Sequence, residues 1–227
     1  MIRWRSYDSG KKGWELKAEM YLSRIAIDPK NQQTMRALDN PEILHGMVEA
    51  CFSGERNRNL WRLDDLNGLT YLLLLSPQEP DFTPLQSQIG MSGSSGETRD
   101  YQPLLDRIQE GSIWRFRLTA NPVESIPQPG KPRGKLKAIT IAAHQRDWLI
   151  RQGKQHGFLL APGQFDVVSS EWRVFRNKGR NLTILSASFE GILTVTDIDR
   201  FKSALQTGIG RGKAYGMGLM TVMSYGR

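Results

Sequence analysis

The chain has 227 residues, which is enough for one large domain or two small ones with a buried core. Lysine and arginine outnumber aspartate and glutamate by 31 to 23, so the net charge is +8 and polyanions are the expected partners, nucleic acid before an anionic membrane. Cys51 is the single cysteine, which excludes an intramolecular disulfide and a cysteine-ligated zinc site and favours a reducing cytoplasm. The longest apolar run, 71–75, is too short to span a bilayer.

The first half begins with residues 1–19, which lack clear periodicity and are interpreted as a loosely attached extension. A helix is expected after Asp39 or Asn40, either of which can cap it, with Pro41 in its first turn and its end near Phe52. The other expected elements of this half are strands at 20–28, 60–63 and 69–75, a turn at Asn67-Gly68, a short helix after Pro84 and a Gly/Ser-rich loop at 90–96.

The second half repeats this order. Its expected elements are a strand at 113–120, a basic loop at 127–137, a helix at 144–155, strands at 165–175 and 182–195 joined by a turn at 177–180, a short helix at 197–205 and a final strand at 214–223.

Each half therefore follows the order strand, helix, two strands, helix, strand, which is the ferredoxin-like unit. The sequence predicts an α+β fold with two tandem ferredoxin-like domains. We place the first domain at 20–110 and the second at 111–227, after the extension at 1–19. The halves share no obvious sequence identity, so this prediction depends on the order of elements alone.

A glycine-rich segment at 208–219, GIGRGKAYGMGL, is the most informative part of the sequence. Glycines let the backbone approach a ligand closely and present its N–H groups to an anion. The candidate anion-binding residues of this segment are Gly208, Gly210, Arg211, Gly212 and Lys213.

The standard nucleotide motifs do not fit this segment. A P-loop needs glycine where Thr207 stands and serine or threonine where Ala214 stands. A dinucleotide-binding fingerprint needs a third glycine where Tyr215 stands. The residues alone therefore leave two interpretations open, an anion-binding loop and a glycine-rich turn that leads into a strand.

The same segment, extended to GIGRGKAYGMGLMTV at 208–222, resembles the C-terminal glycine-rich loop of the RAMP superfamily in its CasE subgroup of CRISPR-associated proteins. Three other stretches agree with the same subgroup. They are MYLSR at 20–24, FRLTANP at 116–122 and FEGILTV at 189–195. Their order and spacing match from residue 20 to about residue 224, so the resemblance covers the chain except for residues 1–19.

The resemblance implies a metal-independent and cofactor-free endoribonuclease that cuts CRISPR precursor RNA at the 3′ base of its repeat hairpin. In such enzymes the ribose 2′-hydroxyl attacks the adjacent phosphate and leaves a 2′,3′-cyclic phosphate and a 5′-hydroxyl. It also implies that the chain stays on the product RNA with the other Cascade subunits and has no membrane role; we expect a monomer within that complex. A non-catalytic RNA-binding or assembly subunit on the same fold remains the alternative.

His45 is the residue that the resemblance matches to the family's catalytic histidine. An imidazole titrates near neutral pH and can move the protons of this reaction. On the expected helix, His45 lies beside an apolar face and should be partly exposed. CasE proteins commonly carry tyrosine three residues earlier, where this chain has Glu42. Glu42 is either a hydrogen-bonding partner of His45 or an acid that favours the helix N-terminus, and we favour the second interpretation.

Basic residues form three clusters. A cluster that alternates with aromatic residues is expected to contact the RNA stem, and it comprises Arg173, Arg176, Lys178 and Arg180. A second cluster is interpreted as a flexible loop that can fold onto phosphates, and it comprises Lys131, Arg133, Lys135 and Lys137. The third comprises Arg56, Arg58 and Arg62 and is expected to lie on an ordinary surface. No tight Asp, Glu and His cluster with metal-ligand spacing stands out, so a metal-dependent nuclease has no support in the sequence.

Overall fold

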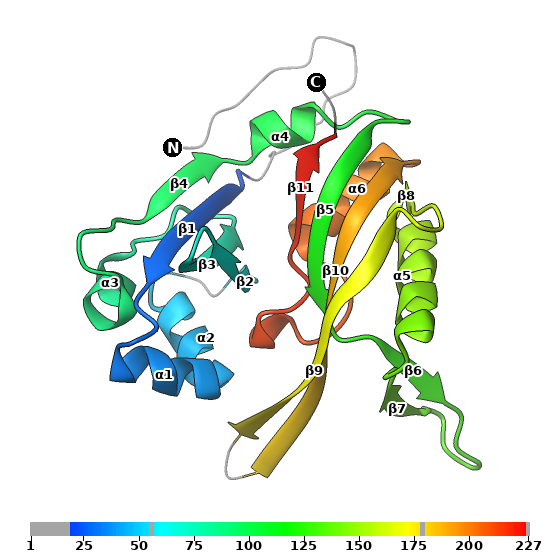
Figure 1. Cartoon of the computed structure of the whole chain (residues 1–227), viewed down its shortest axis with the longest axis horizontal. Helices are drawn as coiled ribbons and strands as arrows, with labels where there is room; N and C mark the ends of the chain where they lie inside the picture. Colours follow the sequence, from blue (N-terminus) through cyan, green and yellow to red (C-terminus); the bar gives the residue numbers. More distant parts are fainter. Residues whose placement is uncertain (1–18, 55–56, 178–179, 226–227) are drawn as a thin grey trace.

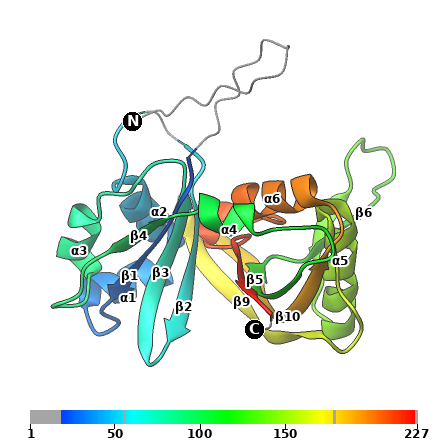
Figure 2. The same cartoon turned by 90° about the horizontal axis from the view of Figure 1, so that it is seen from above.

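The computed structural model describes residues 19–54, 57–177 and 180–225. It contains two antiparallel sheets that lie side by side, each with its own helices (Figure 1 and Figure 2). The predicted extension at 1–19 falls outside the described residues except for Glu19.

The first sheet has the strand order β2-β3-β1-β4. Its elements are β1 (Tyr21–Ile27), α1 (Gln32–Asp39), α2 (Pro41–Glu49), β2 (Leu60–Leu66), β3 (Leu69–Ser76), α3 (Thr83–Ile89) and β4 (Glu97–Asp100). Leu72 and Leu74 of β3 pack in a cluster with the three helices, whereas Leu73 and Leu75 pack in a larger cluster that includes the second half. Since alternate strand residues point to opposite faces, this sheet is buried on both sides, which explains the unbroken leucine run in β3.

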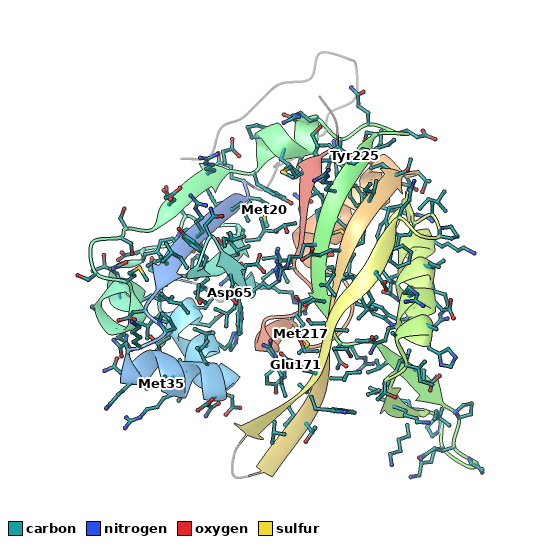
Figure 3. The ribbon with its side chains drawn as sticks, in the orientation of Figure 1. Met20, Met35, Asp65, Glu171, Met217 and Tyr225 are labelled. Carbon is teal, nitrogen blue, oxygen red and sulfur yellow. The ribbon has the colours of Figure 1, made fainter. Side chains whose placement is uncertain are left out.

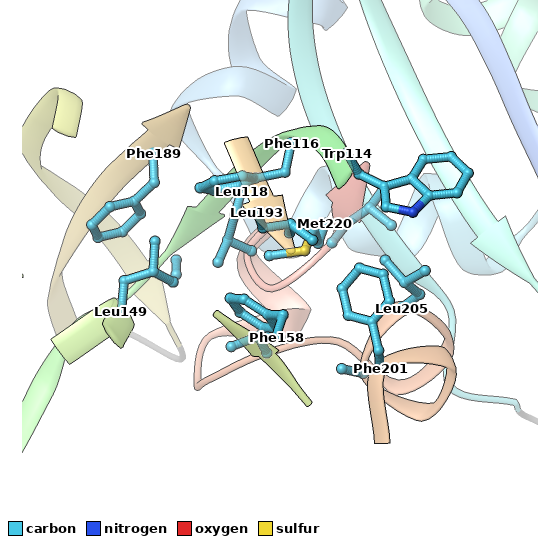
Figure 4. Packing of buried hydrophobic residues seen from close by; sticks show 14 of the residues in the cluster. Trp114, Phe116, Leu118, Leu149, Phe158, Phe189, Leu193, Phe201, Leu205 and Met220 are labelled. Atoms are coloured by element: carbon cyan, nitrogen blue, oxygen red, sulfur yellow. The ribbon is translucent and has the colours of Figure 1, made fainter. Parts of the chain in front are cut away.

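The second sheet has the order β11-β5-β10-β8, with β9 also paired to β10. Its elements are β5 (Ile113–Ala120), α5 (Ala142–His156), β8 (Phe158–Leu159), β9 (Phe165–Asn177), β10 (Arg180–Val195), α6 (Ile198–Thr207), the 3₁₀ turn η1 (Lys213–Tyr215) and β11 (Met220–Ser224). A separate hairpin of β6 (Val123–Ile126) and β7 (Lys135–Ala138) precedes α5, and α4 (Gln102–Asp106) connects the halves. Figure 4 shows the core of this half, where Leu149 of α5 and Phe201 and Leu205 of α6 join the apolar residues of the strands.

The α+β class with two ferredoxin-like domains is confirmed. In the first sheet β1 lies between β4 and β3, and β2 lies on the outer side of β3. In the second sheet β5 lies between β11 and β10, and β9 pairs with β10. Both are the strand order of the ferredoxin-like unit. The sequence did not indicate α1, β4, α4 or the β6–β7 hairpin. The last strand begins at Met220 rather than at 214, because residues 213–215 form the turn η1 instead.

A buried arginine joins the two halves. Arg62 of β2 has a side chain that is 2% exposed, and its guanidinium uses all five of its N–H groups. Two of them donate to both carboxylate oxygens of Asp64, at 2.9 and 2.6 Å. The other three cross to the second half and donate to the carbonyl oxygens of Arg117 and Leu219 and to the hydroxyl of Thr221, at 2.8 to 2.9 Å. The first sheet is therefore tied to β5 and β11 by a single side chain.

The prediction that Arg62 lies on an ordinary surface is wrong. Its partner Asp64 stands two residues later in the same strand, so both side chains point to the same face. Asp64 is also 3.5 Å from Arg117, which is in turn paired with Glu190 at 3.2 Å. Figure 3 shows the region where the halves meet, with Asp65 on one side and Met217 and Glu171 on the other.

Arg62→Ala should lower the free energy of unfolding by about 3–5 kcal/mol, because it leaves Asp64 as a buried carboxylate without its main partner. Arg24→Ala is a matched control in the same sheet: it breaks an exposed pair with Glu97 at 2.9 Å and should cost about 0–1 kcal/mol. Urea denaturation followed by circular dichroism measures both. Equal losses in the two variants would contradict the structural role of Arg62.

Candidate functional site

A pocket of about 580 Å³ lies where the two halves meet. This volume is in the range of about 300–1,000 Å³ that is usual for ligand sites. Three separate segments contribute its lining, which consists of His45 and Glu49 from α2, Asn57, Arg58 and Asn59 from the segment before β2, and Gly210, Arg211, Gly212, Lys213 and Ala214 from the glycine-rich segment. The fold thus brings together residues that are more than 160 positions apart in the chain.

The helix α2 places His45 at the edge of this pocket. The side chain of Asn40 caps the helix by accepting a hydrogen bond from the backbone N–H of Glu42 at 3.1 Å. Leu44 and Val48 are fully buried and attach the helix to its sheet, which leaves the neighbouring His45 half-buried. Ile43, in the same helix, is 40% exposed.

Glu42 occupies the first turn of α2, three residues before His45, and is exposed. Within residues 19–54, 57–177 and 180–225 its carboxylate makes no hydrogen bond or ion pair. It lines a second, adjoining hollow that also includes His45 and Asn59. This position agrees with an acid that interacts with the positive end of the helix dipole.

The glycine-rich segment is seated directly against the first sheet. A Cβ atom added at Gly216 would lie 2.5 Å from the ring of Trp61, and one added at Gly208 would lie 2.9 Å from Leu60. Both glycines also have positive φ, +76° and +77°. Close approach is therefore needed for packing between the halves as well as for presenting backbone to a ligand. The two interpretations of this segment are both compatible with its geometry.

Lys213 is held inside the pocket by its own loop. Its ammonium group donates a hydrogen bond to the carbonyl oxygen of Gly210 at 2.9 Å. Burial, and secondly the positive charge of Arg58, lower the pKa of Lys213. Burial and the charge of Lys213 in turn lower the pKa of His156, at the end of α5. In both groups burial is the larger cause of the lowered pKa, and repulsion by a neighbouring cation is the smaller one.

The β9–β10 hairpin carries the basic cluster expected to contact an RNA stem. Arg173 of β9 is paired with Glu171 at 2.8 Å and does not line the pocket of His45. Arg176 and Arg180 lie on the paired strands near the end of the hairpin, whereas Lys178 falls outside the described residues. The hairpin extends well beyond the rest of its sheet in Figure 1.

The second basic cluster lies partly in regular structure rather than in a flexible loop. Lys135 and Lys137 belong to β7, which pairs with β6, while Lys131 and Arg133 lie in the connection between these strands. All four side chains are exposed, and none of them lines the pocket of His45.

Of the third cluster, Arg58 lines the pocket instead of an ordinary surface, Arg62 is buried, and Arg56 falls outside the described residues. Asn59, which lines the pocket as well, was not singled out from the sequence. A sequence signal for Asn59 would have been its place just before a strand whose first residues pack against the glycine-rich segment. That packing is visible only in three dimensions.

Two kinds of feature are absent from the described part of the chain. Groups of three or more His, Cys, Asp or Glu residues with metal-binding geometry are absent there. None of its helices combines the length and the apolar character needed to cross a membrane.

A family model described as "CRISPR associated protein" matches residues 20–223. The chain belongs to this family of CRISPR-associated proteins. The chain is 29% identical over 219 residues to the CRISPR-associated endoribonuclease Cse3 of Thermus thermophilus, which covers 89% of this chain and 99% of the relative. It is also 29% identical over 123 residues to the Cascade subunit CasE of Escherichia coli, covering 51% of this chain and 60% of that relative.

Solved structures agree with this assignment. The structure of Thermus thermophilus Cse3 bound to an RNA that represents a pre-cleavage complex is similar to this chain with a TM-score of 0.77 and 28% identity, covering 90% of this chain and 99% of that one. The match to a CasE-type protein, as the sequence motifs indicated, is confirmed.

Lys213→Ala should weaken binding of a hairpin RNA and reduce the slope of log K against log salt by roughly 0.7–0.9, the contribution of one phosphate contact. A bound phosphate would stabilise the charged form of Lys213. RNA affinity of the unaltered protein should therefore fall as the pH rises through its lowered pKa, and the variant should lack this fall. Lys154→Ala, at an exposed position of α5 outside the pocket, is the control for filter-binding titrations. An unchanged salt slope in Lys213→Ala would exclude a phosphate contact.

Proposed function

We propose that this protein is a CRISPR endoribonuclease that binds the repeat hairpin and cuts the precursor RNA at the 3′ base of that hairpin. The observation that carries the proposal is the pocket in which His45 meets Arg58, Arg211 and Lys213. An imidazole can transfer protons and the three cations can hold a phosphate, which are the two requirements for cleaving a phosphodiester without an added base. The family and the RNA-bound Cse3 structure support RNA as the substrate.

The reaction that fits this pocket begins at the ribose. The 2′-hydroxyl oxygen attacks the adjacent phosphorus and loses its proton, while the bond from phosphorus to the 5′-oxygen breaks and that oxygen gains a proton. The products are a 2′,3′-cyclic phosphate and a 5′-hydroxyl, and no metal is needed. His45 would protonate the leaving 5′-oxygen or help to deprotonate the 2′-hydroxyl. Lys213 would stabilise the additional charge on the pentacoordinate phosphate.

Glu42 stands where CasE proteins commonly have tyrosine, and the second proton-transfer group is therefore the open part of the mechanism. A Glu42→Gln variant that cleaves more slowly at unchanged RNA affinity would assign it that role. Unchanged cleavage would leave Glu42 as an acid that favours the N-terminus of α2.

We propose further that the chain, as a monomer, stays on its product RNA with the other Cascade subunits in the cytoplasm. The similarity to the Cascade subunit CasE supports this assembly. RNA contacts beyond the pocket would come from the β9–β10 hairpin, the cluster at Lys131–Lys137 and the backbone of Gly208. The backbone of Gly210 and Gly212 would contact the RNA within the pocket.

His45→Ala should slow cleavage of the repeat RNA by roughly 10²–10⁴-fold, the usual contribution of a lost general acid or base, while hairpin binding stays nearly intact. His144→Ala, at an exposed position of α5, is the matched control and should cleave normally. Single-turnover assays with excess protein measure the rate directly. Near-normal cleavage by His45→Ala would refute this role.

The same assays, with EDTA present, test the whole mechanism through end-group analysis of the products. A 2′-deoxy substitution at the cut site should block the reaction, because it removes the nucleophile. Metal-dependent cleavage of the deoxy RNA would overturn the mechanism. Tight binding without any cleavage of the unmodified RNA would instead favour a non-catalytic assembly subunit.

Replacing Arg173, Arg176, Lys178 and Arg180 together by alanine should weaken hairpin binding and flatten its salt dependence by roughly 0.7–0.9 in slope for each phosphate contact that is lost. The single-turnover cleavage rate at saturating protein should change much less, because Arg173 does not line the pocket of His45. If the slope of the fourfold variant equals that of the unaltered protein, the hairpin is not part of the RNA interface.

A further inference from the structure

Arg58 is an arginine whose charge has no carboxylate partner among the described residues. Several other arginines of the described chain, although not all of them, are paired with carboxylates: Arg24, Arg62, Arg117, Arg146, Arg173 and Arg200. In residues 19–54, 57–177 and 180–225, the side chain of Arg58 makes no hydrogen bond and no ion pair. It is exposed into the pocket that also contains His45.

The position of Arg58 relative to the glycine-rich segment is set by the two residues that begin β2. Leu60 is buried against Gly208 and Trp61 against Gly216, at distances that exclude any side chain on these glycines. Arg58 and Asn59 immediately precede this contact. They are consequently held beside residues 210–213 by backbone geometry rather than by partners of their own.

Asn59 provides a second, independent indication of a ligand. Its residue surface is only 8% exposed, yet its side-chain oxygen has no hydrogen-bond partner in the described chain. A buried polar atom without a partner is destabilising and is rare in folded proteins unless a ligand or water completes it. Asn59 lines both the pocket of Arg58 and the adjoining hollow of Glu42. Asn59 therefore borders the space where a substrate would lie, with its buried side-chain oxygen still without a partner.

The charges of the pocket agree with an anionic ligand. Among the described residues that line it, Arg58, Arg211 and Lys213 are cationic and Glu49 is the single carboxylate. The proximity of Arg58 is one cause of the lowered pKa of Lys213. Two cations that repel each other gain stability when a phosphate binds between them.

We infer that Arg58 and Asn59 are substrate-binding residues at the site of cleavage. Arg58 binds the non-bridging oxygens of the scissile phosphate and stabilises their charge as the 2′-oxygen attacks. The carboxamide of Asn59 accepts a hydrogen bond from a donor of the adjacent nucleotide, either its 2′-hydroxyl or a base N–H. The inference rests on the proposed function, and it assigns roles to residues outside the glycine-rich segment and outside the basic hairpins.

The test for Arg58 combines cleavage and binding. At saturating protein, Arg58→Ala should lower the single-turnover rate by about 10²–10³-fold, the usual effect of losing a group that stabilises transition-state charge. Arg58→Lys keeps the positive charge but loses the bidentate geometry of the guanidinium. Its single-turnover rate should lie between that of the unaltered protein and that of Arg58→Ala. Arg36→Ala removes an exposed arginine from α1, in the same half but outside the pocket, and should cleave normally.

Sulfur substitution of a non-bridging oxygen at the cut site separates contact from a structural effect. The sulfur should slow the unaltered protein and have a smaller effect on Arg58→Ala, because the contact that it disturbs is already absent. Arg58→Ala that cleaves at the normal rate, or that keeps the full sulfur effect, overturns the phosphate contact. If the unaltered protein does not cleave, the proposed function fails instead. In that case the affinity for a 2′-deoxy RNA tests the phosphate contact of Arg58. If Arg58→Ala binds this RNA as tightly as the unaltered protein does, the contact is overturned.

The test for Asn59 is affinity. Asn59→Ala should bind uncleavable RNA about fivefold more weakly, as expected for the loss of one hydrogen bond. If that loss disappears with 2′-deoxy RNA, the donor is the sugar hydroxyl; if it persists, the donor is the base. Asn59→Ser keeps a hydrogen-bonding group and should retain more affinity, which guards against a variant that fails to fold. Unchanged affinity of folded Asn59→Ala for both RNAs overturns the contact.

Discussion

A charged side chain is stable inside a protein only where all its hydrogen-bonding groups find partners, and Arg62 satisfies this condition at the junction of the two sheets. Its partners come from both halves of the chain. The guanidinium geometry is rigid, so the two sheets can meet in only one relative position if all five donors are to be used. The same relative position fixes the shape of the pocket beside this junction. The lining of the pocket comes from α2 and the segment before β2 in one half, and from the glycine-rich segment in the other.

Packing and chemistry are joined in the glycine-rich segment. Its glycines admit Leu60 and Trp61 of the first sheet, so that the segment is pressed against the neighbouring half. The same contact brings Lys213 into the pocket with His45 and Arg58. A substitution that loosens this contact would therefore alter the arrangement of the charged groups even where it leaves each of them in place. Stability and activity are expected to be coupled here more closely than at the exposed basic hairpin.

The electrostatic character of the chain differs between its core and its pocket. At the junction, Arg62 and Arg117 are balanced by Asp64 and Glu190. In the pocket, cations gather with one carboxylate among the described lining residues. Charges at the junction are thus neutralised within the protein, whereas the described lining of the pocket carries an excess of positive charge. The net charge of +8 does not reveal this difference between the junction and the pocket, because a net charge is a sum over all residues.

The sequence by itself determined the fold class and the family, because strand alternation, helix capping at Asn40 and the glycine-rich motif are local patterns that survive in any context. It also indicated His45 and Lys213, through motif matches along the chain. It missed α1 and β4, which are only 8 and 4 residues long. Only the tertiary structure decided that Arg62 is buried and Arg58 lines the pocket, although both stand in the same basic run. Whether each side chain is buried or lines the pocket depends on its direction at the start of β2 and on a contact with a segment about 150 residues away. A sequence pattern contains neither kind of information.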